Sequence, residues 1–267
     1  MIINVPNFDP VLFSIGPLAL RWYSLAYIAG ILFVMFWLKR ENGKDRFLSE
    51  KAYDDWIMWA VGSVLLGGRL GYVLFYNFSY FLVNPLEIFA FWNGGMSFHG
   101  GLLGCIIGSY LFCLKYKVNF LRFGDVMCTS APIALMFGRL ANFINLELYG
   151  RVTNSDYGFI FPGGGYLPRH PSQLYEAFFE GFILFVILFL FSRVEKLRKQ
   201  KGFLSGVFLI GYGSFRFLIE DFRQPDEHIG FLFAEITMGQ LLSFPLILAG
   251  IILVVGVNKF TNTAKNA

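Results

Sequence analysis

Long apolar runs separated by short polar linkers dominate the chain. Seven runs are long enough to cross a membrane as helices, which takes about 20 mostly apolar residues. They cover residues Pro17–Leu38, Asp55–Tyr76, Phe98–Leu114, Gly124–Ile144, Ser172–Phe191, Phe203–Glu220 and Ile236–Val257. The runs are continuously apolar rather than alternating, which favours helices over the strands of a β-barrel. The sequence therefore predicts an all-α integral membrane protein with seven transmembrane helices.

Three linkers are longer or more polar than the others. Residues 77–96 are rich in aromatic side chains and include Pro85, which favours an amphipathic arm in the membrane interface. Residues 146–171 are polar and contain a Pro-Gly-Gly-Gly turn at 162–165, which favours a small irregular head with a short hairpin. Residues 221–235 form a short charged linker. We expect residues 1–267 to form a single polytopic membrane domain.

Composition supports the membrane assignment. Of 267 residues, 56% are hydrophobic and 15% are charged, against about 25% charged residues in soluble domains, and the mean hydropathy is +0.57. The segment before the first run has no basic cluster, so we expect the first helix to be retained rather than cleaved as a signal peptide. Cys105, Cys113 and Cys128 lack metal-ligand spacing, and we interpret them as packing residues.

The distribution of basic residues predicts the orientation. Alternate linkers and the C-terminal tail carry Lys39, Arg40, Lys44, Arg46, Lys51, Lys115, Lys117, Arg122, Arg193, Lys196, Arg198, Lys199, Lys201, Lys259 and Lys265. The positive-inside rule places these residues in the cytoplasm, with the N-terminus outside and the C-terminus cytoplasmic. The remaining basic residues map to the outer side, and all are arginines: Arg21, Arg69, Arg139, Arg151, Arg169, Arg216 and Arg223.

An outer side with arginine and no lysine suggests recognition of an anionic phosphate. Arginine is always charged, and its planar fork matches phosphate oxygens. The alternative is snorkelling to lipid headgroups. That alternative fits Arg21, Arg151 and Arg169 better than Arg139 and Arg216, since the last two share helix faces with polar residues.

Four polar groups interrupt the apolar runs, where ionisable side chains are costly and are functional candidates. Arg139 and Asn142 share a helix face and precede Asn145 and Glu147. This group predicts a phosphate site or, alternatively, a structural clamp between Arg139 and Glu147. The second group aligns on one face of the sixth run and predicts a polar cavity or an ion-pair ladder: Tyr212, Arg216, Glu220 and Arg223.

The other two groups open the third and fifth runs. His99 follows a glycine-rich segment, and its unperturbed pKa near 6.5 suits a general base, although a lone membrane histidine is more often structural. Gln173, Glu176 and Glu180 share a face of the fifth run. We interpret Glu176 as the counter-ion of an interior arginine.

These motifs resemble one family over essentially the whole chain. The run from Gly138 to Gly150 reads G-R-x-x-N-F-x-N-x-E-x-x-G. Together with His99-Gly-Gly, His170-Pro-Ser-Gln-Leu-Tyr-Glu and the segment 212–223, it is similar to the motifs of the prolipoprotein diacylglyceryl transferase family of bacterial membranes.

The resemblance implies an activity, a location and a set of residues. Such enzymes move the diacylglyceryl group of phosphatidylglycerol to the lipobox cysteine of a prolipoprotein, releasing glycerol phosphate, as the first step of lipoprotein maturation. They work in the bacterial cytoplasmic (inner) membrane with the active site toward the outer, periplasmic side. By the resemblance, Arg139 binds the phosphatidylglycerol headgroup. The other residues implied in activity are Tyr23, His99, Asn142, Glu147, Gly150, Tyr212 and Arg216.

The chemistry fits these residue types. A thiolate attacks a glycerol carbon and expels a phosphate, whose developing charge one preorganised donor stabilises by about 3 kcal/mol. We assign Arg139 and Arg216 as the phosphate clamp, His99 as a candidate base or orienting group, and Glu220 as a lining residue of the substrate site. The expected partners are phosphatidylglycerol, the lipobox peptide and membrane lipids. No metal, cofactor or nucleic acid is expected.

Two other classes of protein remain as alternatives. A phospholipid transporter or flippase would also use an outward-facing headgroup site, but the internal repeats common in transporters are absent from the sequence. An intramembrane protease needs a nucleophile beside a base, and no serine–histidine pairing of that type is apparent. Release of glycerol phosphate from phosphatidylglycerol distinguishes the transferase from the transporter.

Overall fold

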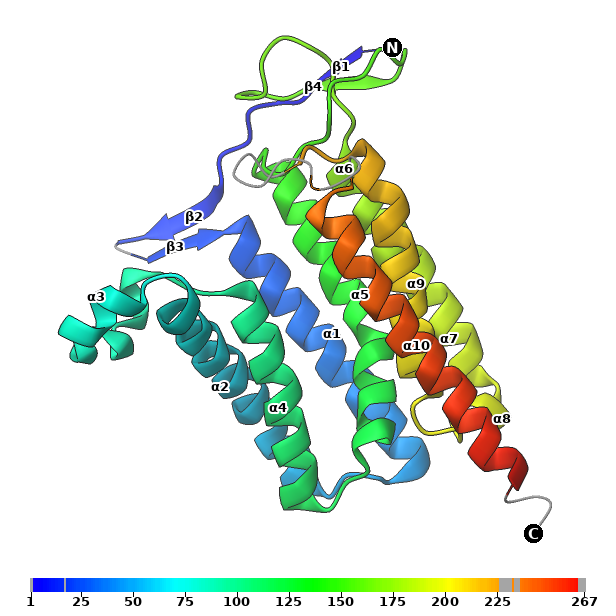
Figure 1. Ribbon diagram of the computed structural model, residues 1–267. Helices are drawn as coiled ribbons and strands as arrows, with labels where there is room; N and C mark the ends of the chain where they lie inside the picture. The colour runs from blue at the N-terminus through cyan, green and yellow to red at the C-terminus, as the bar shows by residue number, and fades with distance from the viewer. Residues whose placement is uncertain (1, 17, 226–231, 233–235, 264–267) are drawn as a thin grey trace. The chain divides into compact units, whose positions relative to one another are not determined.

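Seven helices of membrane length form most of the part of the chain that the computed structural model describes (Figure 1). Positions 1, 17, 226–231, 233–235 and 264–267 lie outside that part, and with them Lys265 and most of the predicted linker 221–235. The membrane-length helices are α1 (Trp22–Asp45), α2 (Glu50–Phe75), α4 (Phe98–Tyr116), α5 (Phe120–Ile144), the continuous run α6, η3 and α7 (Ser172–Arg193), α9 with η4 (Phe203–Phe222) and α10 (Met238–Thr263). The all-α prediction with seven spans is confirmed.

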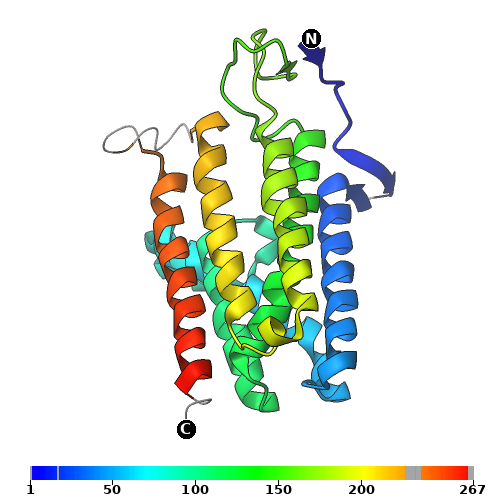
Figure 2. The same cartoon turned by 90° about the vertical axis from the view of Figure 1, so that its right-hand side faces the viewer.

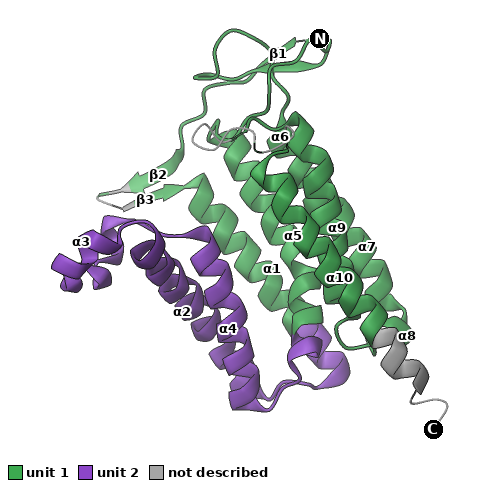
Figure 3. Ribbon diagram, in the orientation of Figure 1, with its two compact units in different colours: residues 1–38, 124–267 green, residues 39–123 purple. Residues whose placement is uncertain are grey.

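The chain divides into two compact units, which are coloured separately in Figure 3. Unit 1 consists of residues 1–38 and 124–267, and unit 2 consists of residues 39–123. Helices α1 and α5 each contribute to both units.

Unit 1 is a helical bundle held together by aromatic packing and by close helix contacts. Trp37 of α1 packs edge to face on Phe185 of α7, with 5.6 Å between ring centroids. Helices α9 and α10 lie side by side (Figure 2), and they approach closely because a Cβ on Gly206 would lie 2.9 Å from the carbonyl oxygen of Gly250. Small residues allow this kind of backbone approach between membrane helices.

The head, defined here as residues 146–171 with the N-terminal strand, closes one end of unit 1 (Figure 1). Strand β1 (Ile2–Asn4) pairs in parallel with β4 (Gly158–Ile160). Phe159 also forms an antiparallel bridge with Arg169. In place of the predicted hairpin, Arg169 forms isolated antiparallel bridges with Val152 and Phe159, and the N-terminus supplies the strand that pairs with β4. Such non-local pairing carries no local sequence signal.

A second small sheet precedes α1. Strands β2 (Val11–Ile15) and β3 (Leu18–Arg21) pair antiparallel around Gly16, whose φ of +57° suits a glycine. The first span therefore begins at Trp22 and not at Pro17 as predicted. The apolar run through residues 11–20 gave no sign of where the strand ends and the helix begins.

Unit 2 is built on α2 and α4, which pack through glycines. A Cβ on Gly67 would lie 2.4 Å from the carbonyl oxygen of Gly100, and a Cβ on Gly104 would lie 2.3 Å from that of Ser63. The glycines therefore let the two helix backbones approach closely, as small residues do between membrane helices. Ser49 caps α2 and Ser97 caps α4, each by accepting a backbone N–H.

The predicted arm at residues 77–96 consists of short helices in unit 2. They are α3 (Phe78–Val83) and the 3₁₀ helices η1 (Pro85–Phe89) and η2 (Phe91–Asn93). Its largest exposed apolar side chains include Val83, Leu86 and Trp92. An exposed apolar surface of this kind fits a lipid interface.

Candidate active site

A cluster of three arginines and three carboxylates lies at the head end of unit 1. Arg139 comes from the last turns of α5, Glu176 from α6 (Ser172–Glu176) and Glu180 from the π-helical segment η3 (Ala177–Ile183). Arg216 comes from α9 (Phe203–Ile219), Glu220 from η4 (Glu220–Phe222), and Arg223 follows η4. These elements meet below the head in Figures 1 and 2. We call this group the arginine–carboxylate cluster.

Glu176 is the centre of the cluster. Its side chain is fully buried, and its Oε1 accepts hydrogen bonds from Nη1 of Arg216 at 2.6 Å and from Nη1 of Arg223 at 2.8 Å. Its Oε2 lies 3.2 Å from Nε of Arg139. The interpretation of Glu176 as the counter-ion of an interior arginine is confirmed, and it serves three arginines rather than one.

The stripe predicted on the sixth span forms an ion-pair ladder. Glu220 Oε2 lies 2.8 Å from Nη2 of Arg216 and 3.8 Å from Nε of Arg223. Gly239 at the start of α10 makes room for this carboxylate, because a Cβ there would lie 2.6 Å from it. The ladder and Glu176 together hold Arg216 and Arg223 in fixed positions.

Arg139 is held more loosely than the other two arginines. Among the described residues its polar partners are Glu176 and Glu180, and its Nη2 lies 3.9 Å from Glu180 Oε2. Its side chain is 20% exposed, against 16% for Arg216 and 11% for Arg223. The alternative for this group, a clamp between Arg139 and Glu147, is wrong, because the partners of Arg139 come from the next span. Arg139 therefore keeps N–H donors for an incoming anion.

Glu180 is a buried carboxylate without a hydrogen bond among the described residues. It is 1% exposed, and its nearest ion-pair partner is the distant Nη2 of Arg139. Gly181 brings η3 close to α5, since a Cβ there would lie 2.5 Å from Cβ of Met136. The sequence placed Glu180 on the same face as Glu176 but gave no reason to select it for the site.

A second polar group joins α1 to the end of α5. Asn142 donates from Nδ2 to the hydroxyl of Tyr23 at 2.7 Å and to Oε2 of Glu147 at 3.4 Å. Asn142 is buried and Glu147 is exposed. Tyr212 lies one turn before Arg216 on α9 and interacts electrostatically with Glu180 and Arg139. The structure thus brings together all of the predicted site residues in unit 1.

Gly150 acts through its backbone. Its N–H donates to the carbonyl of His170 at 2.9 Å, and its carbonyl accepts from Nη1 of Arg169 at 3.1 Å. A Cβ at this position would lie 2.4 Å from the carbonyl oxygen of Phe222 and 2.6 Å from that of His170. Only glycine fits where the loop after α5 crosses these two segments.

Arg151 binds the head to the segment after α9, and Arg169 makes hydrogen bonds within the head. Nε of Arg151 donates to the carbonyl of Arg223 at 2.7 Å, and Nε of Arg169 donates to the carbonyl of Gly164 at 2.9 Å. Snorkelling to headgroups, the alternative considered for both arginines, does not describe these contacts. The rings of His170 and Phe222 lie edge to face with 5.0 Å between centroids, and burial lowers the pKa of the His170 imidazole from its ordinary value.

His99 belongs to unit 2, whereas the other predicted site residues belong to unit 1. It lies in the first turn of α4, is exposed, and contacts the ring of Phe98 edge to face with 5.6 Å between centroids. No contact within unit 2 assigns it a structural partner beyond that ring among the described residues.

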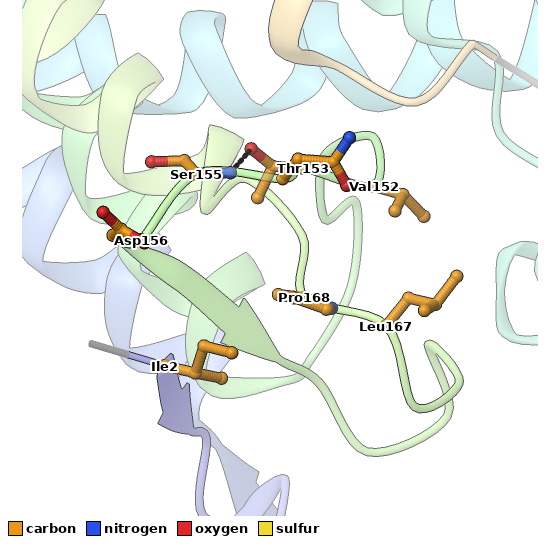
Figure 4. A pocket seen from close by; sticks show the side chains of 8 residues that line it. Ile2, Val152, Thr153, Ser155, Asp156, Leu167 and Pro168 are labelled. Atoms are coloured by element: carbon orange, nitrogen blue, oxygen red, sulfur yellow. Dashed lines mark hydrogen bonds between the residues drawn. The ribbon is translucent and has the colours of Figure 1, made fainter.

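A shallow hollow of about 500 Å³ lies in the head, lined in part by Ile2, Thr153, Asp156 and Pro168 (Figure 4). Within its lining, the N–H of Ser155 donates to Oγ1 of Thr153. Its lining holds an aspartate and no basic side chain, which disfavours an anionic headgroup. In the described part of the chain, no group of three or more His, Cys, Asp or Glu side chains is arranged to hold a metal ion.

Fold and site together define a multi-pass membrane protein with a buried cluster of arginines and carboxylates at one end of the helices of unit 1. A family model described as prolipoprotein diacylglyceryl transferase matches residues 10–256. The chain belongs to this family.

Curated relatives agree over nearly the full length. Proteins named phosphatidylglycerol–prolipoprotein diacylglyceryl transferase are similar to the chain in three bacteria. The one from Rickettsia felis is 53% identical over 247 residues, covering 92% of this chain and 95% of the relative. The one from Rickettsia typhi is 51% identical over 258 residues, covering 96% and 99%. The one from Paramagnetospirillum magneticum is 53% identical over 253 residues, covering 93% of each.

Proposed function

We propose that the arginine–carboxylate cluster binds the headgroup of phosphatidylglycerol, the lipid substrate of this diacylglyceryl transferase. The chain is a multi-pass bacterial membrane enzyme that transfers the diacylglyceryl group of phosphatidylglycerol to prolipoprotein, the first step of lipoprotein maturation. Its partners are phosphatidylglycerol, prolipoprotein and membrane lipids.

The loose attachment of Arg139 carries the proposal. Its ion pairs are 3.2 and 3.9 Å long, whereas Arg216 and Arg223 are bound to Glu176 at 2.6 and 2.8 Å. A guanidinium has five N–H donors, and two carboxylate contacts of this length leave several unused. A phosphate diester can therefore bind Arg139 through a planar fork without breaking the rest of the cluster.

Arg216 completes the phosphate clamp. Its Nη1 and Nη2 are held by Glu176 and Glu220, so its charge is fixed beside the position proposed for the headgroup. A fixed charge in a site shielded from water stabilises developing negative charge more than a mobile one in solvent. Tyr212 lies one turn away on the same helix, and its hydroxyl adds a polar group to the side of the headgroup site that α9 forms.

The transfer has a simple atom balance. The thiolate sulfur of the lipobox cysteine forms a bond to the carbon of the diacylglyceryl group that carries the phosphate, and the bond between that carbon and the phosphate oxygen breaks. The electron pair leaves with the oxygen, and the thiol proton ends on the released glycerol phosphate. A free thiol has a pKa near 8.5, so its deprotonation needs only modest help. His99 is the residue that we propose as base or orienting group.

The other predicted residues shape the site. Asn142 connects Tyr23 and Glu147, which fixes the loop after α5 beside Arg139. Gly150 lets that loop cross the segments at His170 and Phe222. Glu220 orients Arg216 and Arg223. We propose these as positioning groups around the headgroup.

The finer setting is also part of the proposal. We place the enzyme in the bacterial inner membrane, with the head and the cluster on the outer, periplasmic side and the lysine-rich linkers in the cytoplasm. The peptide substrate is the lipobox of the prolipoprotein, and no nucleic acid takes part. No metal or cofactor enters the proposed chemistry.

The direct test uses purified protein with phosphatidylglycerol and a lipobox peptide. We expect glycerol phosphate release and a thioether product that both depend on the peptide cysteine, so a serine peptide gives neither. Phosphatidylethanolamine vesicles serve as the lipid control. Movement of lipid between leaflets without release would favour the transporter instead.

A further inference from the structure

Arg69 makes an unusually complete set of hydrogen bonds within unit 2. It lies on α2 and is 3% exposed, and its hydrogen bonds among the described residues all go to backbone carbonyl oxygens of the arm. The acceptors are the carbonyls of Glu87 (2.6 Å), Ile88 (2.9 Å), Ala90 (3.2 Å), Gly94 (2.5 Å) and Gly95 (3.2 Å). The five bonds match the five N–H donors of a guanidinium.

The arm needs such a donor. Its 3₁₀ helices are short and leave carbonyl groups at their ends without a helical partner. An unpaired backbone carbonyl away from water is costly, and in a membrane irregular backbone persists only where protein groups satisfy it. The rings of Phe81 and Phe91 lie 5.1 and 6.0 Å from the guanidinium carbon, which keeps Arg69 shielded from solvent.

The same contacts fix the segment that leads to His99. Gly94 and Gly95 have φ values of +75° and +77°, and their carbonyls are both held by Arg69. Ser97 then donates its N–H to the carbonyl of Gly68, the residue before Arg69, at 2.9 Å. Ser97 also caps α4 by accepting from the N–H of Gly100. His99 follows in the first turn of the capped helix.

We propose that Arg69 is a positioning residue for His99, because it ties the arm and the segment 94–97 to α2 and so fixes the start of α4. The role of His99 is itself part of the proposed function. Lysine cannot replace Arg69, since it has three donors from a single nitrogen and cannot reach five carbonyls spread over two segments.

The test combines hydrogen exchange with kinetics on Arg69→Lys in lipid nanodiscs. We expect backbone exchange of residues 90–99 to become at least tenfold faster, while residues 203–219 of unit 1 exchange as in the wild type. We expect kcat to fall at least tenfold with the KM for phosphatidylglycerol changed less than threefold. Arg46→Lys, the same change at an exposed position of unit 2, is the matched control.

A second variant disturbs the segment without touching Arg69. In Gly95→Ala the new Cβ would lie 2.5 Å from the ring of Tyr72, so it should reproduce both effects even if Arg69→Lys fails to assemble. Unchanged exchange at residues 90–99, or faster exchange with normal kcat, would overturn the proposal. Full activity of His99→Gln would instead remove the proposed role of His99, while the exchange data would still report whether Arg69 holds the arm.

Discussion

At the scale of single residues, the cluster is a balance of buried charges with one loosely held member. Three guanidinium groups face three carboxylates, and Glu176 joins all three arginines. Removing one partner of a buried ion pair is costly, because it leaves the other charge uncompensated. The contribution of each carboxylate should therefore follow the number and length of its contacts.

Two glutamates one turn apart test this view. Glu176→Gln should lower the free energy of unfolding by roughly 3–5 kcal/mol, because two short hydrogen bonds to arginines lose their charge. Glu180→Gln, the same change on the same helical run, should cost less than about 1 kcal/mol, because Glu180 makes only the 3.9 Å ion pair and a buried carboxylate without hydrogen bonds is itself costly. Denaturant unfolding of the purified variants measures both values. Equal losses would contradict the assignment of Glu176 as the centre.

At the scale of elements, the loop after α5 depends on a close backbone crossing. Leu146 and Leu148 adopt left-handed conformations, with φ of +59° and +56°, so α5 ends sharply and the loop turns toward the head. Gly150 then passes within contact of Phe222 and His170. The family signature contains two glycines, at 138 and 150, but the structure gives them different surroundings.

These two glycines make a matched pair. Gly150→Ala should destabilise the protein by roughly 1–3 kcal/mol, because its Cβ would lie 2.4 Å from a backbone oxygen. Gly138→Ala should be neutral or stabilising, since no described atom lies within 4 Å of its Cβ and alanine favours a helix by about 1 kcal/mol. Thermal unfolding in detergent compares the two. If Gly138→Ala were destabilised and Gly150→Ala were not, the close backbone crossing at Gly150 would be contradicted.

The sequence predicts elements well where the signal is local. The ends of the spans at Phe98, Ile144, Ser172 and Phe203 agree with the structure, because capping residues, glycines and charged linkers mark them. The pairing of β1 with β4 could not be predicted, since these strands lie more than 150 residues apart.

The sequence identified which arginines belong to the cluster, but it did not predict which carboxylates they pair with. Arg139 and Arg216 stand out as charges in apolar runs, which a sequence reveals directly. Their shared partner Glu176 is contributed by a third span, and no spacing rule connects residues on different helices. Nothing in the sequence distinguishes Arg69 from the other outer arginines. Its acceptors are backbone carbonyls, which every residue has, so the pattern of side chains does not predict them.

At the scale of the whole molecule, the separation of lysine from arginine predicts a direction in the membrane. Lysines lie in alternate linkers, whereas the cluster arginines and Arg69 lie on the other side of the spans. The positive-inside rule then assigns the head to the outer side. The thiol of a prolipoprotein and the headgroup of a lipid would meet the enzyme there.

Thiol labelling of intact cells tests this orientation. Asn154→Cys in the head should react with a membrane-impermeant reagent from outside, and Lys117→Cys after α4 should react only after the cells are opened. Both positions are exposed, and the native cysteines lie within spans, so the unmodified protein gives the background. If intact cells labelled Lys117→Cys and not Asn154→Cys, the orientation would be the opposite of the one predicted.

The most direct test of the headgroup site is the rate of glycerol phosphate release by Arg139→Lys. The substitution keeps the positive charge and loses the planar fork that should bind phosphate. With phosphatidylglycerol and a lipobox peptide, we expect kcat/KM to fall about 100-fold or more, corresponding to about 3 kcal/mol of lost stabilisation. Arg193→Lys, at the other end of the same unit, should match the wild type. Near-normal turnover by a folded Arg139→Lys protein would contradict the assignment of Arg139 as the phosphate anchor.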